Sequence, residues 1–485
     1  METEPETPEP EDVVRELRRA EAAGADPEAL AELWSRAASA YRRRFWRGGD
    51  RADLDLAVDG CRTALATGAA GTTGRGTRAN DLAVVLTDRF DVTGDDGDLA
   101  EAMRTVRTAM AEAAEDSAVW AECAATLALC LWDRYDATGS LTDLDQAIAL
   151  GGRALAVLPR TALGWARICS NLAMLHMDRY ERLVEDGDLR ESVRLAEAAV
   201  EAAHADDPEL GGWFNNLGNA LLTRFGMQFG DRGSPRPDEH VDPHDLDAAI
   251  AAYRRAIEVS PWGVAGRATF LSNLGNALVD RAETDRLAGR PERGEPVLRA
   301  AVDALAEAVS ITEATAPYLA SRLNVLGAAQ KAVADATGSA DDIAAARRTL
   351  LRACTAGLLT APEMTVHAAD NWMRWAVQRS AWEDVGEADG YLLQAVDALR
   401  RAQSLRRHHE AWLAAFRGLA QEAAYALVRR GLAEDAAARL ERGRAVLLSE
   451  ALDLVPAAVD RLPEDLRHRY LQAVRRVESA HEDMG

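Results

Sequence analysis

Hydrophobic residues recur along this chain with the spacing of an α-helix. In the segment Ser170–Tyr180, which reads SNLAMLHMDRY, an apolar stripe is formed by Leu172, Ala173, Leu175 and Met177. Residues three and four positions apart share one face of a helix, so this spacing predicts an amphipathic helix. Long β-branched runs, which would favour strands, are absent from the sequence.

A second helix is predicted after each segment of this kind. In 143–159, one face carries Leu144, Ile148, Leu155 and Leu158. Glycines that can end the first helix stand at Gly94, Gly139 and Gly338. The second helix is predicted to open with capping boxes, which read Asp98-x-x-Glu101, Asp143-x-x-Gln146 and Asp188-x-x-Glu191.

The pattern repeats with a period of 45 residues. Motifs of the DLDxAI type begin at Asp53, Asp98, Asp143, Asp188 and Asp245, where only the last step is longer, at 57 residues. The segments that precede these motifs end with the same spacing of 45 residues, at Phe45, Phe90, Tyr135, Tyr180 and Phe225. A repeat of two helices buries its apolar face only against the next repeat. We therefore expect an all-α chain, an α-solenoid of about nine helical hairpins.

Small residues share one register of the first helices. They include Ala173, Gly218, Gly275 and Gly327, and a small side chain at this register lets two helices approach closely. The array is expected to span 12–455. We predict a disordered acidic tail over 1–11 and a C-terminal helical linker over 456–485.

The first-helix motif and the alanine and proline of the second helix resemble tetratricopeptide repeats. The long period, with LGNAL, RF, TGD and DLDxAI elements, is similar to the repeats of actinobacterial proteins that carry a CHAT domain, a caspase-like protease. The segment Leu432–Leu454, and within it ERGRAVLLSE (Glu441–Glu450), resembles the last repeat before that protease. The resemblance covers about residues 30–455. The residues after it contain no matching His–Cys motif, so no catalytic residue is carried over.

Charge narrows the class of partner. The formal net charge is −23, so phosphate-rich nucleic acid and anionic membrane surfaces are disfavoured as partners. A basic peptide or protein fits better, although an excess of surface acid also serves solubility.

The termini and cysteines indicate a reducing compartment. No secretory signal or run long enough to span a bilayer is found, and the five cysteines are scattered. They are expected to be buried apolar residues of a cytoplasmic protein, namely Cys61, Cys123, Cys130, Cys169 and Cys354.

Motifs of enzymes and cofactor sites are absent, so neither catalysis nor a cofactor is expected. The glycine-rich segment Gly71–Asn80 is interpreted as a loop between helices, with no basis for phosphate binding. The insertion Gly226–His244 contains His240 and His244 near carboxylates, which could ligate zinc. We expect a solvated surface loop there, and a solvated face at His408-His409, and therefore no metal site.

Asparagines on the first helices are the candidate binding residues. Asn171, Asn216, Asn273 and Asn371 share one register, and Asn219 and Asn276 follow three residues after two of them. Asparagine is a mediocre helix residue. The resemblance implies a concave groove lined by first helices, in which asparagines grip an extended peptide. The alternative is hydrogen bonding between helices that only fixes the stack.

Recurring Asp-Arg pairs, such as Asp88-Arg89 and Asp178-Arg179, suggest salt bridges from repeat to repeat. The leading hypothesis for function is a protein-binding sensor or scaffold arm of a CHAT-type protease. A stand-alone adaptor is the second hypothesis. A third is the sensing half of a transcription regulator, although no helix-turn-helix or basic segment is found.

Overall fold

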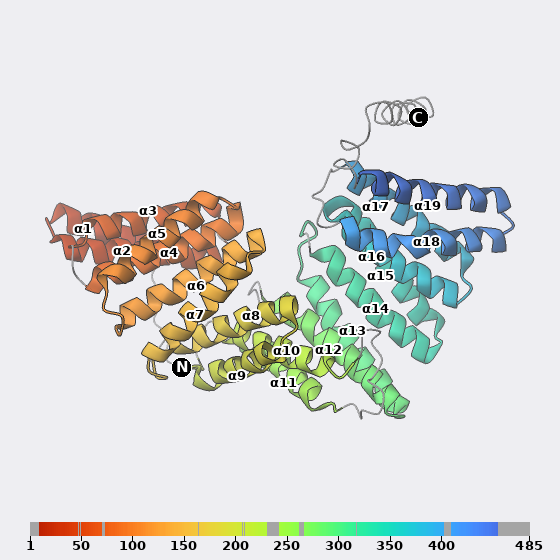
Figure 1. The fold of residues 1–485 in the computed structure, drawn as a ribbon, viewed down its shortest axis with the longest axis horizontal. Coiled ribbons are helices and arrows are strands. Elements are labelled where there is room, and N and C mark those ends of the chain that lie inside the picture. Colours follow the sequence, from red (N-terminus) through yellow and green to blue (C-terminus); the bar gives the residue numbers. More distant parts are fainter. Residues whose placement is uncertain are drawn as a thin grey trace, which may run out of the picture. The chain divides into compact units, whose positions relative to one another are not determined.

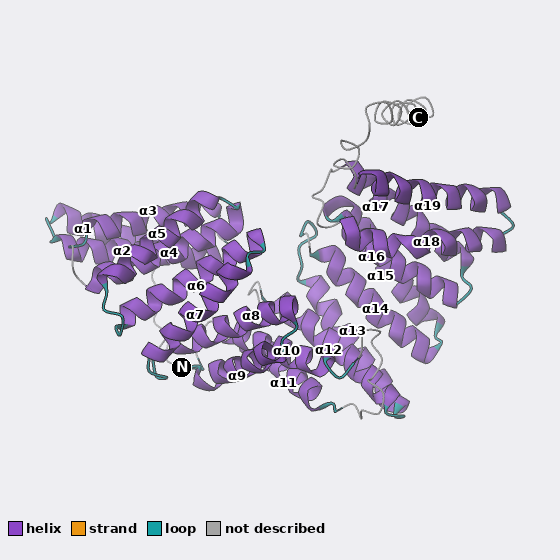
Figure 2. Ribbon diagram, viewed as in Figure 1, coloured by secondary structure: helices purple, strands orange, loops and turns teal. Residues whose placement is uncertain are grey.

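The computed structural model describes residues 9–46, 48, 50–69, 73–162, 164–205, 207, 209–229, 242–260, 266–316, 318–401 and 409–453. These residues form helices α1 to α19 and one short 3-10 helix, and no β-strand occurs among them (Figure 2). The expectation of an all-α chain is confirmed.

The chain divides into two compact units, Met1–Gly294 and Glu295–Gly485 (Figure 1). The helices of the first unit are α1 (Pro10–Ala22), α2 (Pro27–Trp46), α3 (Arg51–Thr67), α4 (Thr73–Thr93), α5 (Asp96–Glu112), α6 (Ala118–Thr138), α7 (Leu141–Val157), α8 (Trp165–Leu183), α9 (Asp186–Ala202), α10 (Leu210–Gly226), α11 (His244–Val259), α12 (Arg267–Leu287) and the 3-10 helix (Pro291–Arg293). The helices assigned to the second unit are α13 (Gly294–Ser310), α14 (Leu319–Thr337), α15 (Ala340–Thr360), α16 (Pro362–Gln378), α17 (Trp382–Arg401), α18 (His409–Arg429) and α19 (Ala433–Asp453).

Within each unit, successive helices pack in pairs. Within the first unit, the pairs from α2–α3 to α10–α11 pack as hairpins, and the second helix of each pair packs against the first helix of the next. The pairs α14–α15, α16–α17 and α18–α19 do the same in the second unit. This nearest-neighbour packing is that of an α-solenoid. Helix α1 begins two residues before the predicted start of the array, and residues 1–8 and 454–485 lie outside the described residues.

The predicted helix stops are present. Gly94, Gly139 and Gly338 adopt φ of 66°, 71° and 66°, the left-handed conformation that ends a helix without a steric cost for glycine. Val184 stands 45 residues after Gly139 and takes the same conformation, with φ of 55°. Val184 is thus a β-branched residue at the position that glycine occupies in the two preceding hairpins, at Gly94 and Gly139.

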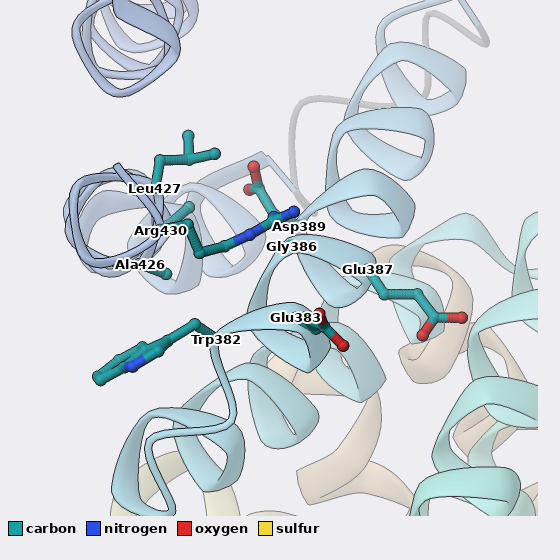
Figure 3. Close-up of a pocket in the computed structure, with 9 residues that line it drawn as sticks. Trp382, Glu383, Gly386, Glu387, Asp389, Ala426, Leu427 and Arg430 are labelled. Atoms are coloured by element: carbon teal, nitrogen blue, oxygen red, sulfur yellow. The ribbon is translucent and has the colours of Figure 1, made fainter. Parts of the chain in front are cut away.

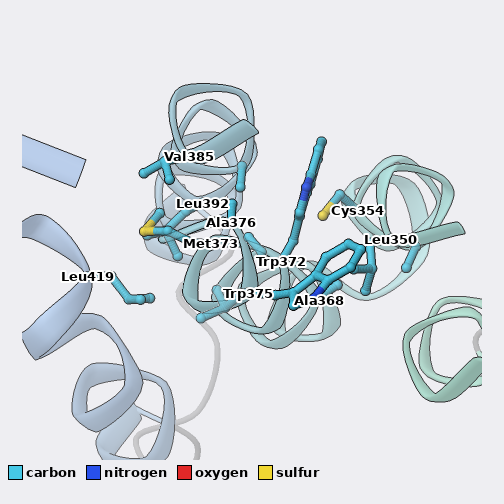
Figure 4. Close-up of a cluster of buried hydrophobic side chains, with 14 of the residues drawn as sticks. Leu350, Cys354, Ala368, Trp372, Met373, Trp375, Ala376, Val385, Leu392 and Leu419 are labelled. Atoms are coloured by element: carbon cyan, nitrogen blue, oxygen red, sulfur yellow. The ribbon is translucent and has the colours of Figure 1, made fainter. Parts of the chain in front are cut away.

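Close helix packing explains the register of small residues. A Cβ on Gly218 would lie 2.5 Å from the ring of Tyr253, and one on Gly327 would lie 2.6 Å from Leu350. In the second unit, the core centres on α16, whose Trp372 and Trp375 are completely buried. Figure 4 shows both indoles directed toward the α15 side of the cluster.

Two local predictions are wrong. Most of the segment Gly71–Asn80 is the first turns of α4, since the helix begins at Thr73. Its glycines allow close packing, because a Cβ on Gly76 would lie 2.4 Å from Val119.

The aspartates of the predicted capping boxes do not cap. Helix α5 begins at Asp96 with Asp95 as its N-cap, so Asp98 lies inside the first turn. Asp98 is buried, with 4% of its surface exposed, and accepts hydrogen bonds from Arg89 instead. Asp143 and Asp188 are likewise buried acceptors for arginine.

Candidate functional site

The arginines of the Asp-Arg motifs hold the hairpins together. At the same register, five arginines each reach an aspartate in the second helix of their own hairpin, in the pairs Arg44–Asp53, Arg89–Asp98, Arg134–Asp143, Arg179–Asp188 and Arg224–Asp245. Arg281 instead pairs with Asp285 in its own helix. Three arginines also reach back to the preceding hairpin, in the pairs Arg89–Asp55, Arg179–Asp145 and Arg281–Asp247. These ion pairs are architectural, and several run from repeat to repeat.

Three predicted asparagines hydrogen-bond to the preceding first helix. Asn216 Nδ2 donates to Ser170 Oγ at 3.1 Å, and Asn273 Nδ2 donates to Asn215 Oδ1 at 2.8 Å. In the second unit, Asn371 Nδ2 donates to Asn324 Oδ1 at 3.3 Å. The Nδ2 group of each of these three amides is therefore used to join first helices.

A cavity of about 340 Å³ brings four of the predicted asparagines together in the first unit. We call it the asparagine cavity; its lining residues are Ala173, Met174, Met177, Asp178, Glu181, Ser192, Asn216, Asn219, Leu222, Thr223, Tyr253, Asn273 and Asn276. Helices α8, α10 and α12 supply most of its wall. Asn171 lies on α8 but does not line the cavity, and Asn371 belongs to the second unit, where Lys331 donates to it at 3.3 Å.

The cavity retains unused hydrogen-bonding capacity. Asn219 Oδ1 accepts from Tyr253 Oη at 2.8 Å and from Asn273 at 3.3 Å, which leaves its Nδ2 for another partner. Asn276 is exposed, and no hydrogen bond to its amide is found among the described residues. An amide offers both a donor and an acceptor, as an extended peptide backbone requires.

Carboxylates stand at one register of the first helices. Asp88, Asp133 and Asp178 are spaced by 45 residues, and Asp280 occupies the equivalent position in α12. Burial, together with the charges of Asp91 and Asp136, raises the pKa of Asp133 to about 7. Among the described residues, Asp133 and Asp280 have no ion pair with an arginine or a lysine.

Two other cavities fit a binding role less well. One of about 400 Å³ lies between α17 and α18, where Arg430 extends toward Gly386 (Figure 3). Two of its three acids, Glu387 and Asp389, are already paired with Arg347 and Arg439. The other, of about 590 Å³, is lined by α1, α2 and α4 and mixes acids with arginines. The asparagine cavity has no arginine or lysine in its lining.

The described residues offer little nucleophilic or metal chemistry. All five cysteines are buried and unpaired, as expected. Burial raises the pKa of each thiol to about 12, so the reactive thiolate is disfavoured at neutral pH. In the part of the chain that the structure describes, no three His, Cys, Asp or Glu side chains could together hold a metal ion. His240, in the insertion, lies outside the described residues.

None of the described helices combines the length and apolar composition needed to span a bilayer. Sequence reasoning missed Tyr253 and Asp178, a member of the carboxylate register, as parts of the asparagine cavity. The signal for the register was available, because Asp88, Asp133 and Asp178 recur with the period of the repeat. Tyr253 carried no such signal, since its role depends on packing across Gly218.

No protein-family model matches the chain, and no curated protein matches it. Solved structures with similarity include BtubC (BKLC) from P. vanneervenii, with 18% identity, 56% of this chain and 94% of that one covered, and a TM-score of 0.35. The human IFIT1 dimer with PPP-AAAA has 11% identity, coverage of 90% and 87%, and a TM-score of 0.42. A STAND protein with a tetratricopeptide repeat sensor from Pyrococcus horikoshii has 13% identity, coverage of 89% and 54%, and a TM-score of 0.45. Similarity at this level carries no information about the partner of the present chain.

Proposed function

We propose that this chain is a protein-interaction scaffold, and that its first unit binds an extended segment of another protein in the asparagine cavity. The observation that carries the proposal is that Asn219 and Asn276 have amide groups available for hydrogen bonding to a ligand. Both line a cavity built from three successive first helices. Extended segments need paired donors and acceptors along their backbone, and residues on successive helices can supply them.

The proposed segment is basic. Asp178 and Glu181 line the cavity, no arginine or lysine does, and the chain as a whole carries a net charge of −23. Electrostatic attraction of this kind speeds encounter with a cationic partner and disfavours anionic ones.

A finer proposal is that the scaffold is the regulatory arm of a CHAT-type protease in the cytoplasm. Support comes from the sequence resemblance of Glu441–Glu450, which falls within α19. A stand-alone adaptor and the sensing half of a transcription regulator are the alternatives. Reading the gene beyond the codon for Gly485 separates them: a His–Cys protease domain supports the first, a stop codon the second and a DNA-binding domain the third.

The binding proposal is tested with Asn276→Ala. A peptide is first selected from a displayed library of random extended peptides, and its Kd for the whole chain is then measured by calorimetry. We expect the substitution to weaken binding by about 0.5–1.5 kcal/mol per lost hydrogen bond. Stability should not fall, because Asn276 is exposed and alanine is the better helix former.

Asn371→Ala is the control, because this asparagine lies in the second unit and lines no part of the cavity. Its Kd should equal that of the wild type. If the selected peptides bind Asn276→Ala and wild type equally well, the asparagine cavity is not the binding site.

A further inference from the structure

Four aspartates share one position in the first helices, and we call them the carboxylate register: Asp88, Asp133, Asp178 and Asp280. Two of them accept hydrogen bonds from side chains of this chain. Asp88 accepts hydrogen bonds from Nε and Nη2 of Arg42, which lies on the preceding first helix 46 residues earlier. Asp178 accepts from the indole Nε1 of Trp132, again 46 residues earlier. The preceding helix therefore presents a donor to the carboxylate at this point of the repeat.

Asp133 and Asp280 receive no such donor. The residue 46 positions before Asp133 is Thr87, whose hydroxyl donates instead to the carbonyl of Val84 at 2.8 Å. Across the longer insertion, the residue equivalent to Arg42 for Asp280 is Leu222, which is apolar. Among the described residues, neither carboxylate has a hydrogen bond or an ion pair.

We propose that Asp133 and Asp280 each receive a cationic side chain, a guanidinium or an ammonium, from the segment bound along the first-helix face. The Arg42–Asp88 pair is the precedent, because it places a guanidinium on the same register of the same array. The proposal rests on the proposed function and adds the chemistry and spacing of the ligand to it.

The surroundings of both carboxylates favour a cation. Asp133 is half-buried, and Asp91 and Asp136 add negative charge around it, whereas Asp280 is exposed, so that a ligand can reach it. A cation placed beside Asp133 restores the charged form that the protein disfavours. Because Asp133 is half-buried, an ion pair there is stronger than one on an open surface.

The array also sets the spacing of the two cations. Asp133 lies on α6 and Asp280 on α12, three first helices apart. With about 8–10 Å between packed helices and about 3.3 Å per extended residue, the two cations are about eight residues apart in the ligand.

The probe is a nine-residue peptide with arginine at each end, glycine and serine between, blocked termini and a neutral fluorophore. Its match replaces both arginines by citrulline, which has the same shape without the charge. The Kd of each probe for the whole chain is measured by fluorescence anisotropy. The arginine probe should bind, and the citrulline probe should bind at least about tenfold more weakly. Equal binding of the two probes, or no binding of the arginine probe, would overturn the inference.

Two sets of variants locate the contact. Asp133→Asn and Asp280→Asn should each weaken binding of the arginine probe by about tenfold and leave binding of the citrulline probe unchanged. The control is Glu201→Gln with Asp303→Asn, both exposed and outside the carboxylate register. If the control matches the register variants, net charge explains the effect and the inference fails.

Thr87→Arg provides a test in the opposite direction, by supplying Asp133 with an internal guanidinium. The variant should fold, as judged by circular dichroism, and bind the arginine probe about tenfold more weakly, whereas Thr87→Gln should not. If Thr87→Arg binds like the wild type, Asp133 does not receive the cation. A loss of peptide binding in Asn276→Ala with no effect of these charge variants would leave the proposed function standing and reject this inference alone.

Discussion

At the scale of single residues, the repeat is informative where one unit departs from its sisters. Val184 occupies the position of Gly94 and Gly139 and keeps their left-handed backbone. Val184 is 69% exposed, so burial does not compensate for the strain. The conformation is imposed by the turn between α8 and α9 rather than chosen by the residue.

Val184→Gly is expected to stabilise the first unit by about 1 kcal/mol. A left-handed conformation costs a residue with a Cβ roughly 1–2 kcal/mol, and glycine escapes this cost while giving up more backbone entropy. Thermal unfolding followed by circular dichroism measures the change. Val92→Gly, an exposed valine in the last turn of α4, should instead lower the melting temperature. A lower melting temperature in Val184→Gly would contradict the strain argument.

Asp133→Asn should raise stability at pH 8 and have little effect near pH 4. The pKa of Asp133 is raised to about 7, so its ionisation costs more free energy in the folded protein than in the unfolded chain. This cost grows as the pH rises from the ordinary value of 3.8 toward 7 and is then constant. Melting temperatures between pH 4 and 8 measure it, with Asp303→Asn as the control. A pH-independent difference would exclude the titration of Asp133 as the cause.

At the scale of elements, partly buried ion pairs connect the two helices of a hairpin and, at some steps, the preceding hairpin as well. Arg179 contacts Asp188 in its own hairpin and Asp145 in the preceding one. Arg134 has no second aspartate of this kind and instead lies 3.9 Å from the sulfur of Met103. An ion pair therefore stabilises the contact between α7 and α8, whereas the contact between α5 and α6 depends on apolar packing.

Arg179→Met should destabilise α8 and α9 by about 3 kcal/mol, because Asp188 would remain buried, with His176 as its remaining partner. Hydrogen exchange of amides in α8 and α9 measures this change. Arg194→Met removes an exposed pair with Glu191 and should cost less than about 1 kcal/mol. Equal effects of the two substitutions would contradict the argument from burial.

The same pair makes the hairpin sensitive to acid. Burial opposes ionisation of Asp188, but hydrogen bonds from Arg179 and His176 outweigh it, and the pKa is lowered below 3.8. A lowered pKa means that the stabilisation is complete above the ordinary value and is lost as the pH falls through the folded value. The difference between wild type and Arg179→Met should therefore shrink below about pH 4.

At the scale of the whole molecule, nearest-neighbour packing limits how far a local change extends. Each hairpin contacts mainly the hairpins before and after it, and the chain divides into two compact units. In such arrays, stability is close to a sum of local terms.

Trp372→Ala should lower the stability of the second unit by about 3–5 kcal/mol, because this indole is completely buried in its core. Hydrogen exchange should increase in α15, α16 and α17 and remain unchanged in α4 to α7. Leu144→Ala, at a buried position of α7, should give the reverse pattern. Faster exchange throughout the chain after either substitution would mean that the units unfold together.

The sequence by itself determined the helical fold, the period of 45 residues and the helix ends at glycine. These features are local, since a stripe of apolar residues or a glycine after a helix acts within one or two turns. Five of the six candidate asparagines could also be placed on successive first helices from the repeat alone, because the repeat carries a register from one hairpin to the next, although only four of them line the cavity.

Only the tertiary structure decided what each polar residue does. Asp98 was predicted to cap a helix and instead pairs with Arg89, because its environment depends on the facing helix rather than on its neighbours in sequence. The same holds for Asn273, whose amide joins α12 to α10, while Asn276, three residues later, has no partner among the described residues. Tyr253 enters the cavity wall only because Gly218, on another helix, leaves space for its ring. Hydrogen-bond partners and burial arise between elements distant in sequence, so the period of the repeat could place these side chains but could not assign their contacts.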